Sequence, residues 1–482
     1  MSFLLSRRSA LQTLAGALCP QAGQPQGKPD RPNILFIPVD DLNDWVEDFG
    51  GHPQTVTPNL HRLSQQGVRF QRAYCQAPMC NPSRASLFTG LRCTTTGVYK
   101  NDDTWRDGAK SVVTLTEYFR KYGYRADGLG KTFHSKQTDY SCFDSYFQGD
   151  VDDNATGLPD GAKPRKLKGA AKVLQWGGID VPEEQTGDTQ IALEAVRLLK
   201  AGYKQPFFLA PGFRKPHMPW YAPKKYFDKF PAESVKLPPY LENDLDDVPR
   251  SAIHRNLVDH FHAIRDVGKW KEAVAAYLAC INYVDANVGR ILDALESSPY
   301  RDNTIVMVWG DHGWHLGEKD HWQKFTLWER SCRAPLIVRA PGTKGSGDCH
   351  RVVEFLDVYP TLIDLCGLPK NSKLEGRSLK PLLDNPSATW DGVGITSDGP
   401  DKITVRTERY RYSRFPDGEE LYDEQADPNE WTNLARRAEA KPLMEKLRRE
   451  LGSRLPVNAN RKEPRSWDSL SAAEKRRLRG RS

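Results

Sequence analysis

The chain has 482 residues, of which 38% are hydrophobic and 10% aromatic, so it can bury a large core and is not intrinsically disordered. Its net charge of +7 comes from its two ends: residues 1–30 carry +2 and residues 461–482 carry +5, which leaves residues 31–460 neutral. A neutral body gives no reason to expect nucleic acid binding, and no apolar run approaches the ~20 residues of a membrane-spanning helix. We therefore expect a soluble globular protein without a membrane span.

The first 27 residues have the composition of an export signal. Arg7 and Arg8 precede a short apolar stretch at 10–18, and a run rich in Gly, Gln and Pro follows it. This order is typical of a signal peptide, and the paired arginines resemble the twin-arginine type, although an amphipathic first helix is the alternative. The signal predicts a periplasmic or extracellular location. There the eight cysteines that follow Cys19 either pair as disulfides or stay as thiols.

Strand-like apolar runs and helical patterns alternate along residues 28–370. The predicted strands are 33–39, 124–128, 206–210 and 304–309, and the predicted helices are 57–67, 115–121, 189–200 and 271–296. This alternation predicts an α/β fold, a large, mostly parallel sheet sandwiched by helices. The predicted strands at 402–407 and 410–415 and the helix at 441–451 indicate a smaller α+β subdomain with an antiparallel sheet at 371–456. Residues 457–482 would form a basic, peripheral tail.

Two acidic clusters follow the two most apolar of these strands. Asp40 and Asp41 come directly after 33–39, and Asp311 and His312 come just after 304–309. Ligands of such sheets bind at the carboxyl ends of the strands, so both clusters belong at one edge. Adjacent buried carboxylates are costly unless a hard divalent cation compensates their charge. An Asp pair alone could be a helix cap, but two clusters favour a metal site.

A cysteine at a turn lies between these clusters. Cys80 is followed by Pro82, which makes the segment rigid, and by Arg84, which would lie on the same side of a starting helix. A lone cysteine is usually buried and structural, whereas a cysteine near a cation and a metal is an activated thiolate.

The segment Cys80-x-Pro82-Ser83-Arg84, with Thr89-Gly90 downstream, resembles the signature of the type I sulfatases in the alkaline phosphatase superfamily. Further segments that resemble this family follow in the same order over most of the chain. They are Pro32-Asn33-Ile34, Thr57-Pro58-Asn59-Leu60, Gly130-Lys131-x-Phe133-His134, Lys215-Pro216-His217, Asp311-His312-Gly313 and Glu420-Leu421-Tyr422-Asp423. The segments around His134, His217 and His312 are most similar to the iduronate-2-sulfatase branch.

The resemblance implies an alkaline-phosphatase-like fold and a sulfuric ester hydrolase that acts on a sulfated carbohydrate. It implies that a maturation enzyme converts Cys80 to formylglycine, whose hydrate attacks sulfur, and that Arg84 orients and helps to activate this gem-diol. Lys131 would bind the sulfate oxygens. His217 would protonate the leaving alkoxide, and His134 would take the remaining proton of the diol.

Two further assignments come from the same resemblance. Lys324, placed by its distance after Asp311-His312-Gly313, would be a second ligand of the sulfate. One Ca²⁺ would be held by Asp40, Asp41, Asp311, His312 and the modified Cys80.

Other functions and other roles stay open. A phosphoester or phosphonate ester hydrolase uses the same scaffold, and a non-catalytic binder of sulfated glycans would keep Cys80 unmodified. Six residues close to the site segments either line a sugar pocket or pack under loops: Asp44-Trp45, Trp220-Tyr221 and Trp314-His315.

Overall fold

The structure is a computed structural model that describes residues 31–109, 112–134, 138–149 and 174–455. The predicted export signal at 1–27 and the basic tail at 457–482 lie outside these residues. All elements described below belong to one unit, which begins at Pro32. No helix within the described ranges is both long and apolar enough to cross a membrane.

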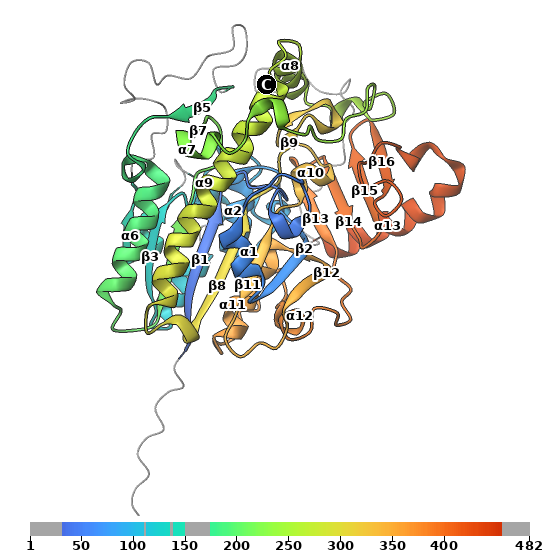
Figure 1. Ribbon diagram of the computed structural model, residues 1–482. Coiled ribbons are helices and arrows are strands. Elements are labelled where there is room, and N and C mark those ends of the chain that lie inside the picture. The colour runs from blue at the N-terminus through green and yellow to red at the C-terminus, as the bar shows by residue number, and fades with distance from the viewer. Residues whose placement is uncertain (1–30, 110–111, 135–137, 150–173, 456–482) are drawn as a thin grey trace, which may run out of the picture. The chain divides into compact units, whose positions relative to one another are not determined.

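An eight-stranded sheet forms the centre of this unit, in the order β12-β2-β11-β8-β1-β6-β3-β4 (Figure 1). Its strands are β1 Asn33–Val39, β2 Val68–Tyr74, β3 Arg125–Gly130, β4 Ser145–Phe147, β6 Phe207–Gly212, β8 Thr304–Gly310, β11 Leu336–Arg339 and β12 Gly347–Glu354. Neighbouring strands from β8 to β4 are parallel, as are β2 and β12, whereas β11 is antiparallel to both β8 and β2. The predicted large, mostly parallel sheet is confirmed, and the four predicted strands correspond to β1, β3, β6 and β8.

Helices cover both faces of the sheet because β1 is apolar on both sides. Ile34 and Phe36 pack into one apolar cluster with α2 (Cys80–Thr89), α5 (Leu115–Lys121) and α11 (Val358–Leu365). Leu35 and Ile37 pack into another with α1 (Pro58–Ser64), α6 (Gly187–Ala201) and α9 (Trp270–Glu296). Successive residues of a strand point to opposite faces, so a strand covered on both sides is continuously apolar. The four predicted helices of this region correspond to α1, α5, α6 and α9.

A four-stranded antiparallel sheet follows in the chain, in the order β13-β14-β15-β16. Its strands are Gly394–Ser397, Ile403–Arg406, Tyr410–Phe415 and Gly418–Asp423, and α13 (Lys441–Arg454) packs against it. The predicted antiparallel sheet is confirmed, including the pairing of 402–407 with 410–415. Tyr74 and Trp328 pack with Phe415 and Tyr422 and so join this sheet to the rest of the unit. The domain boundary near residue 370 stays a prediction.

Short elements complete the described chain. The helices are α3 Cys93–Thr96, α4 Trp105–Gly108, α7 Lys224–Phe227, α8 Arg255–Arg265, α10 Glu329–Cys332 and α12 Lys380–Asp384. Two small sheets pair β5 (Trp176–Ile179) with β7 (Trp220–Pro223) and β9 (His315–Leu316) with β10 (Trp322–Gln323). No disulfide joins any two of the eight cysteines in the described ranges, which are all buried. Of the two alternatives for these cysteines, the structure has the thiols.

Candidate active site

The two acidic clusters meet because β1 and β8 are parallel neighbours. Val39 pairs with Gly310, so the residues that follow each strand leave the sheet side by side. The backbone N–H of Asp41 donates to Oδ1 of Asp311 at 3.0 Å, and both side chains are fully buried. The structure thus brings together Asp40, Asp41, Asp311 and His312, four of the five residues expected to bind a metal, at the edge of the sheet where the sequence predicted them.

Cys80 is the first residue of α2, and its thiol lies at this edge. Its Sγ is 3.4 Å from Nε2 of His312, 3.8 Å from Oδ1 of Asp41 and 3.2 Å from Nζ of Lys324. The side chain has no exposed surface. Burial and Asp40 raise the pKa of the Cys80 thiol, but Lys324 and Lys131 lower it by more, so this pKa lies below its usual value. This environment is that of an activated thiol rather than of a structural cysteine.

Arg84 lies one turn further along α2 and binds both acidic clusters. Its Nε donates to Oδ2 of Asp311 at 2.9 Å, and its Nη2 donates to Oδ1 of Asp40 at 3.2 Å. Its Nη1 donates to the backbone carbonyls of Lys131 and Thr132, which follow β3. The planar guanidinium therefore holds α2 and the ends of three strands in one arrangement, as only a forked donor can.

Two buried lysines complete the charge balance of the site. Lys131 pairs with Oδ2 of Asp40, and Lys324, directly after β10, pairs with Oδ1 of Asp41 at 2.5 Å. With Arg84, three cations face the three aspartates of the site. Burial would raise the pKa of Asp40, but Lys131, His217 and Arg84 hold it well below its usual range. For Asp41, burial outweighs Lys324 and raises the pKa to about 7.

His217 and His134 both lie within reach of these charges. His217, in the loop between β6 and β7, has Nε2 at 3.9 Å from Oδ2 of Asp41 and Nδ1 at 2.5 Å from the carbonyl oxygen of Met218. A carbonyl only accepts, so Nδ1 carries a proton in this contact and Nε2 faces the site. Burial and Lys131 lower the pKa of His217 well below its usual value and that of half-buried His134 to about 4.

The donor atoms at this edge fit a hard cation. Ligand atoms of Asp40, Asp41, Cys80 and His217 all lie within 4.8 Å of one another, as do those of Cys80, Asp311 and His312. Oδ2 of Asp41 is buried and has no hydrogen-bond partner. A carboxylate oxygen in that position is costly unless a cation binds it, and carboxylate oxygens are the ligands that Ca²⁺ prefers.

Some supporting residues were not predicted from the sequence. Ser83 donates from Oγ to the carbonyl of Asp311 at 2.5 Å, and Lys215 donates from Nζ to the carbonyl of Pro219 at 2.7 Å. Both residues belong to segments that resemble the family, so the sequence could have indicated that they support the site. Asp188, at the start of α6, accepts the backbone N–H of Lys215 at 2.8 Å and holds the loop that carries His217. Nothing in the sequence around Asp188 indicates this role.

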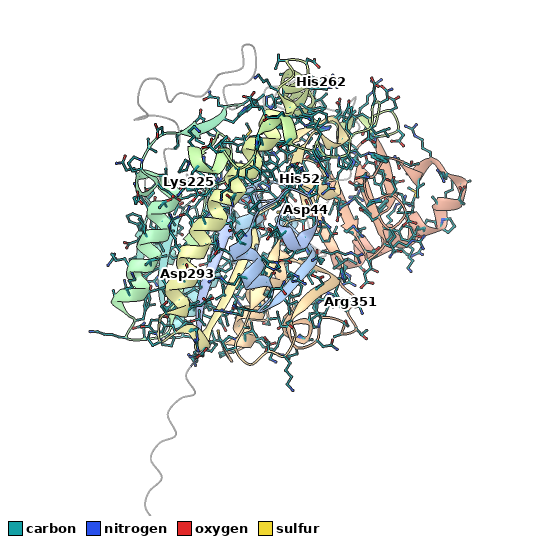
Figure 2. The ribbon with its side chains drawn as sticks, viewed as in Figure 1. Asp44, His52, Lys225, His262, Asp293 and Arg351 are labelled. Atoms are coloured by element: carbon teal, nitrogen blue, oxygen red, sulfur yellow. The ribbon has the colours of Figure 1, made fainter. Side chains whose placement is uncertain are left out.

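The aromatic residues that follow the site segments are packed in the core. Trp45 and Trp220 are 0% exposed and Trp314 is 1% exposed. Asp44, labelled in Figure 2, pairs with Arg330 at 2.8 Å and also with Arg333. Of the two alternatives for these residues, the structure therefore has packing beneath the site rather than the lining of a sugar pocket.

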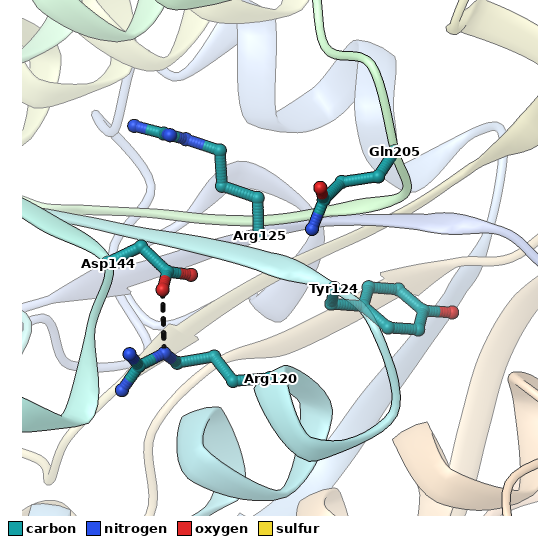
Figure 3. A pocket seen from close by; sticks show the side chains of 5 residues that line it. All are labelled: Arg120, Tyr124, Arg125, Asp144 and Gln205. Carbon is teal, nitrogen blue, oxygen red and sulfur yellow. Dashed lines mark hydrogen bonds and ion pairs between the residues drawn. The ribbon is translucent and has the colours of Figure 1, made fainter.

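A polar pocket lies at the amino ends of the strands, opposite the carboxyl ends that carry the site. Arg125, the first residue of β3, and Gln205, just before β6, lie on it together with Tyr124 (Figure 3). Arg120 and Asp144 complete its lining and pair with each other at 3.0 Å. This edge is a strand length of about 20 Å from the carboxyl ends of the same strands. The side chains with reactive chemistry converge at the carboxyl edge and not in this pocket.

Comparisons with known proteins agree with this geometry. The family model described as Sulfatase matches residues 32–368, and one described as N-sulphoglucosamine sulphohydrolase, C-terminal, matches residues 317–455. A protein of Formosa agariphila named Sulfatase is 38% identical over 447 residues, which cover 88% of this chain and 87% of that protein. Iduronate 2-sulfatase of Homo sapiens is 31% identical over 388 residues, which cover 70% of each chain.

Solved structures share the fold. The structure of BT4656 in complex with its substrate D-glucosamine-2-N,6-O-disulfate has a TM-score of 0.71 at 23% identity, covering 90% of this chain and 100% of that one. The phosphonate monoester hydrolase of Agrobacterium radiobacter has a TM-score of 0.72 at 24% identity, covering 88% and 95%. At these identities the two structures show a common scaffold and no common substrate.

Proposed function

The chain belongs to the sulfatase family and is a sulfuric ester hydrolase, and from this premise we propose that it removes sulfate from a sulfated carbohydrate through a formylglycine made from Cys80. The observation that supports this most directly is the surroundings of the Cys80 thiol. Its Sγ is 3.2 Å from Nζ of Lys324 and 3.4 Å from Nε2 of His312, at an edge that also gathers three buried aspartates.

The proposed reaction uses the aldehyde that replaces the thiol. Water adds to the aldehyde of residue 80 to give a gem-diol. One diol hydroxyl loses its proton to water, and its oxygen bonds to sulfur while the bond from sulfur to the sugar oxygen breaks. The second diol hydroxyl then loses its proton, the carbonyl reforms and sulfate leaves. A cysteine or serine at this position could not reform a carbonyl and would stay sulfated after one turnover.

Four side chains have proposed parts in these steps. Lys131 and Lys324 would bind the sulfate oxygens, since both ammonium groups lie at the acidic edge. His217 would give a proton to the departing sugar oxygen. His134, whose lowered pKa of about 4 leaves it neutral at neutral pH, would accept the proton of the second diol hydroxyl.

Arg84 would orient the diol, because its fork already fixes the start of α2 against Asp40 and Asp311. A guanidinium held by two carboxylates cannot move with the substrate, so the nucleophile keeps its direction through the reaction. Arg84 would therefore both orient the diol and hold α2 against Asp40 and Asp311.

We propose that Asp40, Asp41, Asp311, His312 and the modified residue 80 hold one Ca²⁺. When bound, the ion supplies positive charge to the diol and to the sulfuryl oxygens. The unpartnered Oδ2 of Asp41 and the mutual closeness of the ligand atoms support this site. The three aspartates are already balanced by Arg84, Lys131 and Lys324, so a divalent ion gives the site a net positive charge, which suits an anionic sulfate ester.

The relatives support a class of substrate that can be tested against the alternatives. Iduronate 2-sulfatase of Homo sapiens, 31% identical to this chain, is named for a sulfated sugar. The test is kcat/KM of the matured protein for a sulfated glucosamine or uronic acid, compared with a phosphonate monoester. We expect the sulfated sugar to be preferred. A preference for the phosphonate would contradict the proposal, and no turnover above a Cys80→Ala variant would indicate a glycan binder.

We also propose that the chain is exported after maturation in the cytosol. The twin-arginine pattern at Arg7 and Arg8 supports export of a folded protein. Cys80 is fully buried in the folded chain, so a maturation enzyme has to reach it before α2 packs against the sheet. Cell fractionation of the wild type and of an Arg7→Lys, Arg8→Lys variant tests this, and export of the variant at the wild-type level would contradict the twin-arginine route.

A further inference from the structure

The turn that carries Asp40 and Asp41 is bound by a tyrosine of the long helix α9. The hydroxyl of Tyr277 donates to the carbonyl oxygen of Asp41 at 2.7 Å and accepts the backbone N–H of Asn43 at 3.0 Å. Tyr277 is 0% exposed, so solvent does not reach these two backbone groups and the hydroxyl is their hydrogen-bond partner. None of the segments that resemble the family contains Tyr277 or Asn43.

Asp41 needs such support because of its backbone conformation. Its φ is 60°, in the left-handed region that residues with a Cβ rarely adopt. Such a conformation persists only where the surrounding structure holds it. Here the N–H of Asp41 is bound by Asp311 and its carbonyl by Tyr277. In this conformation Oδ1 of Asp41 lies 3.3 Å from Nε2 of His312, so the two acidic turns share one space.

The same hydrogen bonds extend to the second acidic turn. Nδ2 of Asn43 donates to the carbonyl oxygen of Trp314 at 3.3 Å, two residues after His312. Its Oδ1 accepts the backbone N–H of Trp45 at 3.0 Å, which fixes the amide group. Asn43 therefore connects the turn after β1 to the turn after β8, and Tyr277 fixes Asn43.

The ring of Tyr277 is held by three tryptophans. The ring centroids of Trp45, Trp220 and Trp314 lie 5.5, 5.3 and 6.4 Å from that of Tyr277. All three indoles are buried, so close packing restricts the orientation of the ring and keeps the hydroxyl at Asp41 and Asn43.

We propose that Tyr277 and Asn43 are positioning residues that set the spacing of the two acidic turns and thereby the affinity of the site for its divalent cation. The inference rests on the metal site of the proposed function. Both residues act through the ligands and touch neither substrate nor ion. Removal of a group that orients metal ligands costs about 10–100-fold in metal affinity, and we expect a loss of at least about tenfold here.

The test is calorimetric titration of chelator-treated protein with Ca²⁺, with residue 80 matured to the same aldehyde fraction in every variant, as verified by peptide mass. Tyr277→Phe keeps the ring and removes the hydroxyl alone. The matched control is Tyr283→Phe, because Tyr283 lies on the same helix and its hydroxyl accepts the N–H of Thr189 at 3.1 Å, away from the acidic turns. Circular dichroism before titration verifies that each variant is folded. Asn43→Ala, which keeps the backbone N–H that Tyr277 binds, is a second variant if Tyr277→Phe does not fold.

We expect Tyr277→Phe and Asn43→Ala to bind Ca²⁺ at least about tenfold more weakly than the wild type, and Tyr283→Phe to bind it as the wild type does. The rise in thermal midpoint on adding Ca²⁺ should shrink in the same two variants. Wild-type affinity in Tyr277→Phe, or an equal loss in Tyr283→Phe, would overturn this inference alone. A wild-type protein that binds no Ca²⁺ would overturn the proposed metal site and the inference with it.

Discussion

The role of His217 can be tested by changing the leaving group together with the residue. If its Nε2 protonates the departing oxygen, Gln in its place removes a general acid that contributes about 10²–10⁴-fold in rate. That factor equals about 3–5 kcal/mol of transition-state stabilisation. A sugar alkoxide needs the proton, whereas 4-nitrophenolate leaves without one. We expect His217→Gln to lower kcat/KM by about 10²–10⁴-fold for a sugar sulfate and by less than about tenfold for 4-nitrophenyl sulfate.

The structure also gives the sign of the pH dependence. Nδ1 of His217 is 2.5 Å from the carbonyl of Met218, so the neutral ring has its proton there and Nε2 has to gain one to act as an acid. Burial and Lys131 lower the pKa of His217, so this acidic form is lost as pH rises. For a sugar sulfate, kcat/KM should therefore fall from acidic to neutral pH in the wild type, and this fall should be absent in His217→Gln.

The assay measures kcat and kcat/KM for both substrates across this pH range, with His134→Gln as the matched control. His134 is proposed to act after the leaving group has departed. Its removal should lower kcat for both substrates alike and affect kcat/KM less, because kcat/KM reports steps up to that departure. Equal losses of kcat/KM for sugar and aryl sulfates in His217→Gln would refute the assignment of His217 as the general acid.

The metal site, the guanidinium and the maturation step each give a further expected outcome. The pKa of Asp41 is raised to about 7, and that of His312 is raised to about 9 because Asp311 outweighs the effect of burial. Both ligands lose a proton to bind the ion, so Ca²⁺ affinity measured by calorimetry should increase from pH 6 to pH 9. A constant affinity would contradict the ligand set. Arg84→Lys keeps the charge but loses the forked contact with Asp40 and Asp311, so kcat/KM should fall by about 10²-fold or more, and a wild-type value would count against its role. Maturation enzyme added to the folded protein should leave Cys80 a thiol by peptide mass, since the side chain is fully buried, and conversion of the folded chain would disprove the need for earlier action.

The part of the fold that follows from local patterns could be predicted. The runs before Asp40 and Asp311 are buried at every position and apolar after their first residue because both faces of β1 and β8 are covered, and such runs end at the edge where ligands bind. The start of α2 at Cys80 follows from Pro82 and from the resemblance around Arg84. Lys324 could be placed only by its distance from the Asp311 segment, and the structure places its Nζ 3.2 Å from Sγ of Cys80.

What could not be predicted depends on contacts between distant parts of the chain. The segment of β2 contains Arg69, Gln71 and Arg72 among its apolar residues, so its sequence does not predict a buried strand. Its pairing with β11 and β12 has no signal in the local sequence. Tyr277 lies in a helix whose neighbouring positions are all buried, where a tyrosine looks like any core residue. Only the fold brings its hydroxyl to Asp41. Likewise, Trp220 follows a site segment, and its sequence position could not distinguish a pocket wall from the core.

The central claim is that formylglycine at position 80 is the nucleophile for sulfate ester hydrolysis. The most direct measurement is the rate of sulfate release from a sulfated sugar in several preparations matured to different extents, plotted against the fraction of aldehyde found by mass spectrometry of the Cys80 peptide. The rate should be proportional to the aldehyde fraction and zero where the peptide is entirely thiol. Sulfate release by protein that contains only the Cys80 thiol would contradict the account.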